Sequence, residues 1–256
     1  LGRLRSRTQS FDEPCDHAMD WKGHEWTPEA GHKAAHPNAR FTAPATQCPA
    51  ICADWDDPAG VPIDIFVFGG RRTQVIPLVT QAFDFDHGVF MGAMAASETT
   101  AAALDVGQNL RHDPFAMLPF CGYNMADYWA HWFAMGDKLG DKAPKIFYVN
   151  WFRTSREGRW LWPGFGDNSR VLKWMCERVE GKIGARETPI GYMPHDGDFD
   201  LRGLNFPAED FAELMDVDIA AFQQDVANAK AYLAKFGDRV PPRLTQQLAA
   251  LEARLG

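Results

Sequence analysis

The chain has 256 residues, of which 46% are hydrophobic, and its formal net charge is -8. This length and composition predict one globular unit with a sizeable core and argue against a disordered chain. The negative charge argues against broad electrostatic attraction to nucleic acid or to an anionic membrane surface.

The cysteine pattern and the lengths of the apolar segments indicate the cellular compartment in which we expect the protein. Five scattered cysteines without a CxxC pair fit a reducing compartment better than a disulfide framework: Cys15, Cys48, Cys52, Cys121 and Cys176. The opening arginines have no apolar run behind them, and no segment reaches about 18 uninterrupted apolar residues. We therefore expect a soluble, cytoplasmic protein with neither a secretory signal nor a membrane span.

Residues 1–60 are polar and rich in proline and histidine, so we expect extended loops there with room for one short strand. This beginning resembles connecting segments cut away from something upstream. His32 and His36 are interpreted as loop histidines, and the spacing of Cys48 and Cys52 does not predict a zinc site. The sequence HPNAR, ending at Arg40, offers an amide and a guanidinium that suit a small carboxylate.

A strand is predicted from Val61, where VPIDIFVF is rich in β-branched and aromatic residues and is stopped by Gly69-Gly70. Arg71 and Arg72 follow at once. Two guanidinium groups at a strand end could meet phosphate oxygens, because open α/β sheets bind ligands there, or could form surface ion pairs. The spacing alone does not decide between these interpretations.

Further elements give a mixed α/β layout. Strands are predicted over residues 89–97 and 145–152, and helices over 122–139, 169–181 and the C-terminal tail. The helix over 122–139 shows apolar spacing at Met125, Tyr128, Trp132 and Met135. Two stripes in the tail indicate core packing: Phe222, Val226, Ala229 and Leu233, then Leu244, Leu248, Leu251 and Leu255. The predicted fold is a mixed sheet flanked by helices.

Two loops are candidates for function. SETTAAALDVGQN, residues 97–109, consists mostly of small residues and could be a mobile lid, although its alanines favour an ordinary connecting helix. Residues 150–168 place five large aromatics among glycines and polar residues. These rings could form a purine slot with Asn168 at its edge, a core cluster under a loop, or a carbohydrate platform, and the residues alone favour core packing. Neither GxxxxGK[ST] nor GxGxxG occurs.

Six motifs in series closely resemble the GTP-dependent phosphoenolpyruvate carboxykinases, in that family's order: HPNARFTAPATQCP, FGGRR, HGVFMGA with SETTAAA, DPFAMLPFCGYN, PKIFYVNWFR and LWPGFGDNSRVLKW. The resemblance runs from about Asp20 to the C-terminus, leaves residues 1–19 unmatched, and makes 20–256 a partial C-terminal catalytic and nucleotide-binding domain. It implies a lyase of gluconeogenesis that converts oxaloacetate and GTP to phosphoenolpyruvate, GDP and carbon dioxide.

The resemblance also implies roles for particular residues. Arg71 resembles the arginine that contacts the nucleotide phosphates. Arg40, the catalytic candidate, resembles the residue that bridges the organic acid, GTP and the transferring phosphoryl group. The remaining substrate-binding residues are Asn38 and Ala39. The guanine pocket consists of Trp151, Phe152, Trp160, Phe165, Gly166, Asp167 and Asn168. The resemblance reverses the preference for a helix and implies a mobile lid formed by Ser97, Glu98, Thr99, Thr100, Ala101, Ala102 and Ala103.

The resemblance implies a manganese ion that stabilises the enolate, with its ligands and the phosphate loop upstream of this chain, so no metal ligand is assigned here. Expected partners are GTP or GDP and oxaloacetate or phosphoenolpyruvate, in a monomer that binds neither nucleic acid nor membrane. Trp160, Asp167 and Met125 depart from the family's usual phenylalanine, glutamate and phenylalanine, and we expect nucleotide binding to survive. The alternatives are a guanine-nucleotide-binding fragment without turnover and a carbohydrate-binding module.

Overall fold

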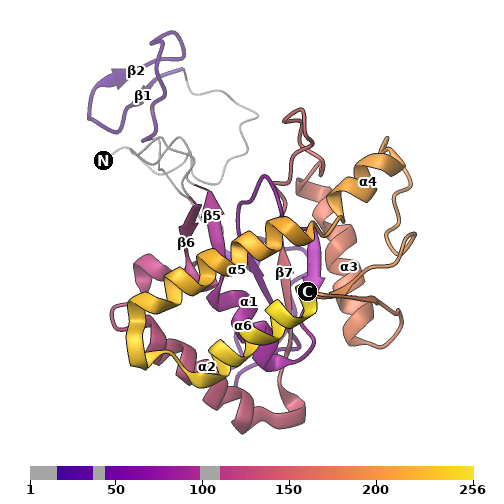
Figure 1. Cartoon of the computed structure of the whole chain (residues 1–256). Helices are drawn as coiled ribbons and strands as arrows, with labels where there is room; N and C mark the ends of the chain where they lie inside the picture. The colour runs from indigo at the N-terminus through magenta and orange to yellow at the C-terminus, as the bar shows by residue number, and fades with distance from the viewer. Residues whose placement is uncertain (1–15, 37–43, 99–109) are drawn as a thin grey trace. The chain divides into compact units, whose positions relative to one another are not determined.

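The computed structural model describes residues 16–36, 44–98 and 110–256 (Figure 1). The described residues form two compact units, where the composition predicted one, with the division between Pro62 and Ile63. Within the described ranges, no helix is long and apolar enough to cross a membrane.

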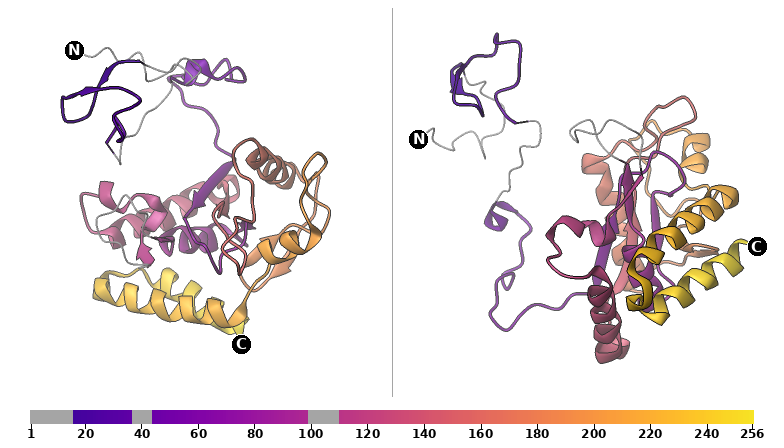
Figure 2. Two further views of the ribbon diagram at one scale, coloured as in Figure 1. Left: turned by 90° about the horizontal axis from the view of Figure 1, so that it is seen from above. Right: turned by 60° about the vertical axis from the view of Figure 1, so that its left-hand side comes forward.

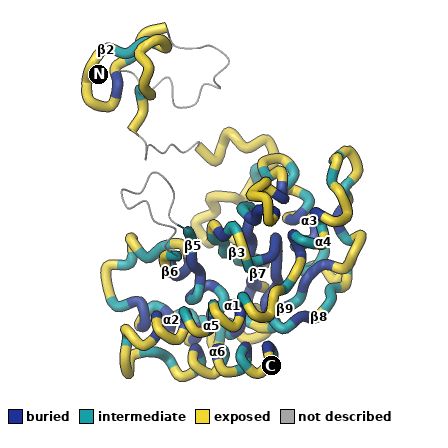
Figure 3. The backbone as a smooth tube through the Cα atoms, turned by 45° about the horizontal axis from the view of Figure 1, so that its top comes forward, coloured by how far each residue is buried: buried dark blue, intermediate teal, exposed yellow. Residues whose placement is uncertain are grey.

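The first unit holds little regular structure, as its polar sequence predicts. β1 (Ala18–Met19) and β2 (Glu25–Trp26) form an antiparallel pair, and a 3-10 turn spans Ala45–Gln47. The buried Asp20 carboxylate closes the β1–β2 connection because it accepts hydrogen bonds from the backbone N–H groups of Lys22 and His24, at 2.8 and 2.9 Å. Most residues of this unit are exposed (Figure 3).

The second unit is built on a five-stranded sheet in the order β3-β7-β4-β9-β8. Its strands are β3 (Ile65–Gly69), β4 (Val79–Gln81), β7 (Lys145–Val149), β8 (Arg186–Thr188) and β9 (Gly191–Met193). β3 runs parallel to β7, and every other neighbouring pair is antiparallel. A separate antiparallel pair joins β5 (Ala96–Glu98) to β6 (Leu110–His112).

Six helices of the second unit have the bounds α1 (Phe85–Ala93), α2 (Met125–Leu139), α3 (Asn168–Val179), α4 (Ala208–Leu214), α5 (Ile219–Leu233) and α6 (Pro242–Leu255). Short 3-10 helices span Pro114–Ala116, Leu118–Phe120, Gly140–Lys142, Phe165–Asp167 and Ala234–Arg239. α5 and α6 lie side by side in both further views (Figure 2).

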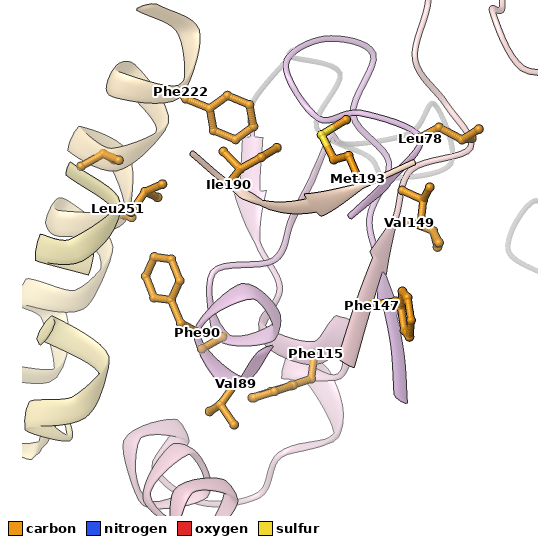
Figure 4. Close-up of a cluster of buried hydrophobic side chains, with 14 of the residues drawn as sticks. Leu78, Val89, Phe90, Phe115, Phe147, Val149, Ile190, Met193, Phe222 and Leu251 are labelled. Carbon is orange, nitrogen blue, oxygen red and sulfur yellow. The ribbon is translucent and has the colours of Figure 1, made fainter. Parts of the chain in front are cut away.

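Helices cover both faces of the sheet. Alternate residues of β7 point to opposite faces, so this strand contacts the helices on each side. Ile146 packs so closely on α1 that a Cβ at Gly88 would lie 2.5 Å from it. Phe147 faces the other way and packs edge to face on Trp174 of α3, with ring centroids 5.9 Å apart. α6 lies outside α1, and Phe90 of α1 points toward its Leu251 (Figure 4). The elements that surround the core therefore form successive layers: α3, the sheet, α1 and then the C-terminal helices.

The strand predicted over residues 89–97 is wrong for most of its length. α1 continues to Ala93, and β5 occupies only Ala96–Glu98. The Asp84 side chain caps the helix by accepting a hydrogen bond from the His87 N–H at 2.7 Å. The apolar run looked like a strand because α1 is buried between the sheet and α6, which removes the polar face that marks an amphipathic helix.

The other predicted helices are present, with one adjustment. In α2 the fully buried residues are Met125, Ala126, Trp129 and Phe133, so the buried face is rotated from the predicted stripe. Tyr128 and Trp132 are half-buried and pack against the core from its edge. Both stripes of the C-terminal tail are buried along α5 and α6, as predicted.

Candidate functional site

The predicted site residues of the second unit follow the carboxyl ends of two neighbouring strands. β3 and β7 are parallel, and their last paired residues are Gly69 and Val149. The segment after β3, beginning at Gly70, and the segment after β7, beginning at Asn150, therefore emerge side by side. The carboxyl ends of parallel strands are where open α/β sheets bind ligands. The register thus brings the FGGRR turn next to the aromatic loop.

Gly70 is required where the chain leaves β3. A Cβ built at this position would lie 2.6 Å from the Ala96 carbonyl oxygen of β5 and 2.6 Å from the Tyr148 hydroxyl of β7. Burial raises the pKa of the Tyr148 hydroxyl to about 12, so this group stays protonated and neutral. The turn can approach β5 only because residue 70 has no side chain.

The two arginines after Gly70 have different environments. The guanidinium of Arg72 is buried and pairs with Asp225 of α5 at 2.8 Å. Arg71 is exposed, and its guanidinium makes no ion pair with any residue in the described ranges. The ion-pair interpretation therefore applies to Arg72, and Arg71 presents its charge to solvent.

The described part of the predicted lid holds the Arg71 turn in place. Ser97 and Glu98 lie on β5, where the Ser97 hydroxyl oxygen accepts a hydrogen bond from the Arg71 N–H at 3.0 Å. The Glu98 carboxylate accepts hydrogen bonds from the Thr73 N–H and hydroxyl, at 2.8 and 2.9 Å. The rest of the predicted lid, residues 99–103, lies outside the described residues. The start of the lid is thus tied directly to the turn that carries Arg71.

A short hairpin forms the first half of the aromatic loop. Thr154 and Trp160 form an isolated antiparallel bridge, and the Leu161 N–H donates to the Arg153 carbonyl at 3.0 Å. The hairpin sets the rings of Phe152 and Trp160 edge to face, with centroids 6.0 Å apart and planes at 75°. Trp160 is 56% exposed, so its indole remains accessible.

The second half of the loop separates an exposed ring from a buried one. Phe165 is 95% exposed and has a φ of 49°, in the left-handed region that a non-glycine residue seldom adopts. Trp162 is 2% exposed and packs on Phe206. The core-cluster interpretation therefore holds for Trp162. It fails for Phe165, whose ring contributes almost nothing to the core.

Asn168, the predicted reader of the purine edge, begins α3. Its Oδ1 already accepts a hydrogen bond from the Trp162 indole N–H at 2.8 Å. The amide keeps its two N–H donors and a second lone pair on Oδ1. Gly166 and Asp167 line an adjoining polar groove of about 340 Å³, in which the Asp167 carboxylate pairs with Arg170 at 3.0 Å.

Asn38, Ala39 and Arg40 lie outside the described residues. Within residues 16–36, 44–98 and 110–256, no group of three or more His, Cys, Asp or Glu side chains could hold a metal ion. The described residues therefore do not form a manganese site.

A cavity of about 120 Å³ lies among α1, α5 and α6, and its lining includes Arg72 but neither Arg71 nor any residue of the aromatic loop. His87 lines this cavity and is 2% exposed. Its Nδ1 accepts a hydrogen bond from the Phe83 N–H at 3.1 Å. Burial lowers the pKa of the His87 imidazole to about 4, so the ring is neutral at physiological pH.

Sequence reasoning missed Asn150, the residue that connects the two segments. Its side chain is completely buried and bonds to the backbone on both sides of the site. The available signal was a lone polar residue directly after the buried strand KIFYV, since a buried amide must find partners. Thr73 and Thr154 connect the same two segments, because the Thr154 N–H donates to the Thr73 carbonyl at 2.9 Å.

Comparisons with known proteins cover most of the chain. The family described as "Phosphoenolpyruvate carboxykinase C-terminal P-loop domain" matches residues 8–254. The GTP phosphoenolpyruvate carboxykinase of Corynebacterium jeikeium is 48% identical over 248 residues, which are 96% of this chain and 41% of that protein. The GTP phosphoenolpyruvate carboxykinase of Treponema pallidum is 53% identical over 229 residues, which are 88% of this chain and 37% of that protein. The chain spans about two fifths of the length of these relatives.

Proposed function

Because the chain belongs to the phosphoenolpyruvate carboxykinase C-terminal P-loop domain family, we propose that it supplies the guanine-nucleotide site of a GTP-dependent carboxykinase. The whole protein would convert oxaloacetate and GTP to phosphoenolpyruvate, GDP and carbon dioxide. The observation that supports this assignment best is the parallel β3–β7 pair, which delivers the exposed Arg71 and the aromatic loop to one edge of the sheet.

The aromatic loop has the properties that a purine pocket needs. Phe165 and Trp160 are exposed rings that lose little core packing by turning toward a ligand. A flat base stacks on such rings, and stacking is worth about 1–3 kcal/mol per base. The free N–H groups of Asn168 suit acceptors on the base edge. The carbohydrate interpretation gains no comparable support, since it does not explain the neighbouring arginine.

Arg71 supplies charge for the phosphates. The chain as a whole is acidic, so an anionic nucleotide must be met by placed cations. A guanidinium that is exposed and not engaged by a carboxylate binds phosphate oxygens with charge-assisted hydrogen bonds. Arg72 cannot substitute, because Asp225 already neutralises it.

The remaining steps belong to Arg40 and to the predicted lid, most of which lies outside the described ranges. Arg40 would bridge the organic acid and the transferring phosphoryl group and stabilise charge that develops during transfer. Residues 97–103 would close over the substrates and exclude water from the reactive enolate. Manganese, gluconeogenesis, a cytoplasmic location and a monomeric state complete the proposal as expectations from the family resemblance.

The test uses the whole protein that contains this chain. Phosphoenolpyruvate formation is measured with oxaloacetate and either GTP or ATP, for the wild type, Arg71→Ala and Arg239→Ala. Arg239 is an exposed arginine paired with Asp127, so its loss controls for the change in charge. We expect turnover with GTP, an increase in the GTP KM of at least about tenfold for Arg71→Ala, and almost no effect of Arg239→Ala.

Two outcomes would contradict the proposal. A folded protein that neither binds GTP nor forms phosphoenolpyruvate would overturn it. Binding of GTP without turnover would favour the alternative of a nucleotide-binding protein. Titrating tryptophan fluorescence with GTP, ATP and a panel of sugars distinguishes these outcomes from carbohydrate binding, because Trp151 and Trp160 belong to the aromatic loop assigned to the purine.

A further inference from the structure

Asn150 makes four hydrogen bonds with a side chain that has no exposure to solvent. Its Oδ1 accepts from the backbone N–H groups of Arg72 and Phe152, both at 3.2 Å. Its Nδ2 donates to the backbone carbonyls of Arg72 at 2.8 Å and Ile76 at 2.9 Å. The side-chain orientation is unambiguous, because the oxygen faces two N–H groups and the nitrogen faces two carbonyls.

These bonds connect the two halves of the candidate site. Arg72 and Ile76 belong to the turn after β3, which carries Arg71. Phe152 belongs to the aromatic loop after β7. A single oxygen atom, Oδ1, accepts one hydrogen bond from each segment. The Asn150 amide, together with the hydrogen bond from the Thr154 N–H to the Thr73 carbonyl, therefore sets the relative position of the two segments.

The turn that Asn150 holds is conformationally strained. Val75 has a φ of 72°, which is unfavourable for a β-branched residue, and it lies between the two carbonyls that accept from Asn150 Nδ2. A strained conformation persists only where surrounding contacts determine it, and such positions cluster at binding sites. Without the amide, the turn loses three hydrogen bonds that oppose relaxation at Val75, and two of them are made by Arg72, the neighbour of Arg71.

We propose that Asn150 is a positioning residue that fixes the spacing between the base-holding loop and the phosphate-holding turn, an inference that rests on the proposed GTP site. A nucleotide joins a base and a phosphate chain covalently. It gains from both subsites at once only when they are held at the matching distance, because the second contact is then intramolecular. Asn150 touches neither part of the nucleotide and acts through the two segments.

The test compares GTP with its two separate parts. Dissociation constants for GTP, guanosine and inorganic tripolyphosphate are measured on the whole protein for the wild type, Asn150→Ala and Thr188→Ala. Thr188 is a matched control, since it is buried and its hydroxyl bonds to backbone groups in the β8–β9 turn. A merely structural role predicts similar effects for the two substitutions.

We expect Asn150→Ala to weaken GTP binding by at least about tenfold while guanosine and tripolyphosphate each change by less than about threefold. Thr188→Ala should leave all three constants unchanged. The proposal is overturned if the loss of GTP affinity equals the product of the losses for the two parts, or if GTP binding is unaffected. A wild type that binds none of the three would refute the proposed function itself.

A second measurement needs no substitution and so covers the case in which Asn150→Ala does not fold. Amide hydrogen exchange of the wild-type protein is followed with each part alone. Tripolyphosphate should slow exchange at the Phe152 N–H, and guanosine should slow exchange at the Arg72 N–H, because both amides donate to Asn150 Oδ1. Protection confined to each ligand's own segment would overturn the coupling.

Discussion

Replacing Phe165 by alanine separates binding from folding. Its ring is 95% exposed, so the substitution removes almost no buried apolar area. The free energy of unfolding should therefore change by less than about 0.5 kcal/mol. The ring nevertheless lies on the loop assigned to the purine, where loss of one stacking face costs about 1–3 kcal/mol. That cost corresponds to a GTP dissociation constant raised about 5- to 150-fold.

Trp162→Ala is the matched comparison from the same loop. Trp162 is 2% exposed, and truncation of a buried tryptophan costs about 3–5 kcal/mol of folding free energy. Phe165→Gly adds an internal check, because glycine accepts the φ of 49° without strain and should raise stability slightly while still losing the stacking face. Substitution of Phe165 should therefore weaken GTP binding with little effect on stability, whereas substitution of Trp162 should lower stability.

Thermal unfolding and calorimetric titration with GTP, on the same preparations of the whole protein, measure both quantities. The reasoning is refuted if Phe165→Ala destabilises the fold as much as Trp162→Ala. It is equally refuted if Phe165→Ala is stable and binds GTP with wild-type affinity.

Three further predictions follow from other parts of the molecule. Gly70→Ala should lower stability by about 1–3 kcal/mol and raise the GTP KM, because its Cβ would clash with the Ala96 carbonyl, whereas Gly122→Ala has open space and should be neutral in thermal melts. The lowered His87 pKa, about 4 against 6.5, means that the neutral ring stabilises the fold fully above about pH 6.5 and that this contribution, about 3 kcal/mol, is lost as pH falls to about 4. His87→Asn should flatten that slope in unfolding titrations, and an unchanged slope would exclude His87 as its source. Arg40→Ala should lower kcat at least about 100-fold in steady-state assays, and near-normal turnover would remove Arg40 from its assigned role.

The sequence predicted those elements whose local pattern matches their environment. The leucine stripe of α6 and the apolar stripe of α5 face the core on one side only, so helical periodicity identified them. β3 and the strand β7 were equally clear, since a short apolar run ended by glycine or a polar residue indicates a buried strand. In these cases local preference and tertiary environment agree.

The prediction for the α1 segment was wrong for the opposite reason. It is buried on several sides, and Gly88 and Gly92 lie where the helix touches Ile146 and Phe115. Glycine and apolar residues at those contacts remove the amphipathic signal and lower helix propensity. Only tertiary packing shows why a helix forms there.

The sequence supplied candidate residues for the site but not their arrangement. Aromatic residues in a glycine-rich loop made Trp160 and Phe165 candidates, yet residue type could not separate the exposed Phe165 from the buried Trp162. Nor could it distinguish Arg71 from Arg72, whose partner Asp225 is 153 residues away. Such distinctions depend on long-range contacts, which a linear pattern does not contain.

A crystal structure of the whole protein with bound GDP tests the central claim most directly. The account predicts guanine stacked on the aromatic loop at Phe165, with the phosphates directed to the Arg71 guanidinium and the Asn150 bonds intact. Guanine bound elsewhere, for example in the cavity beside His87, with Arg71 directed away from the phosphates, would contradict it.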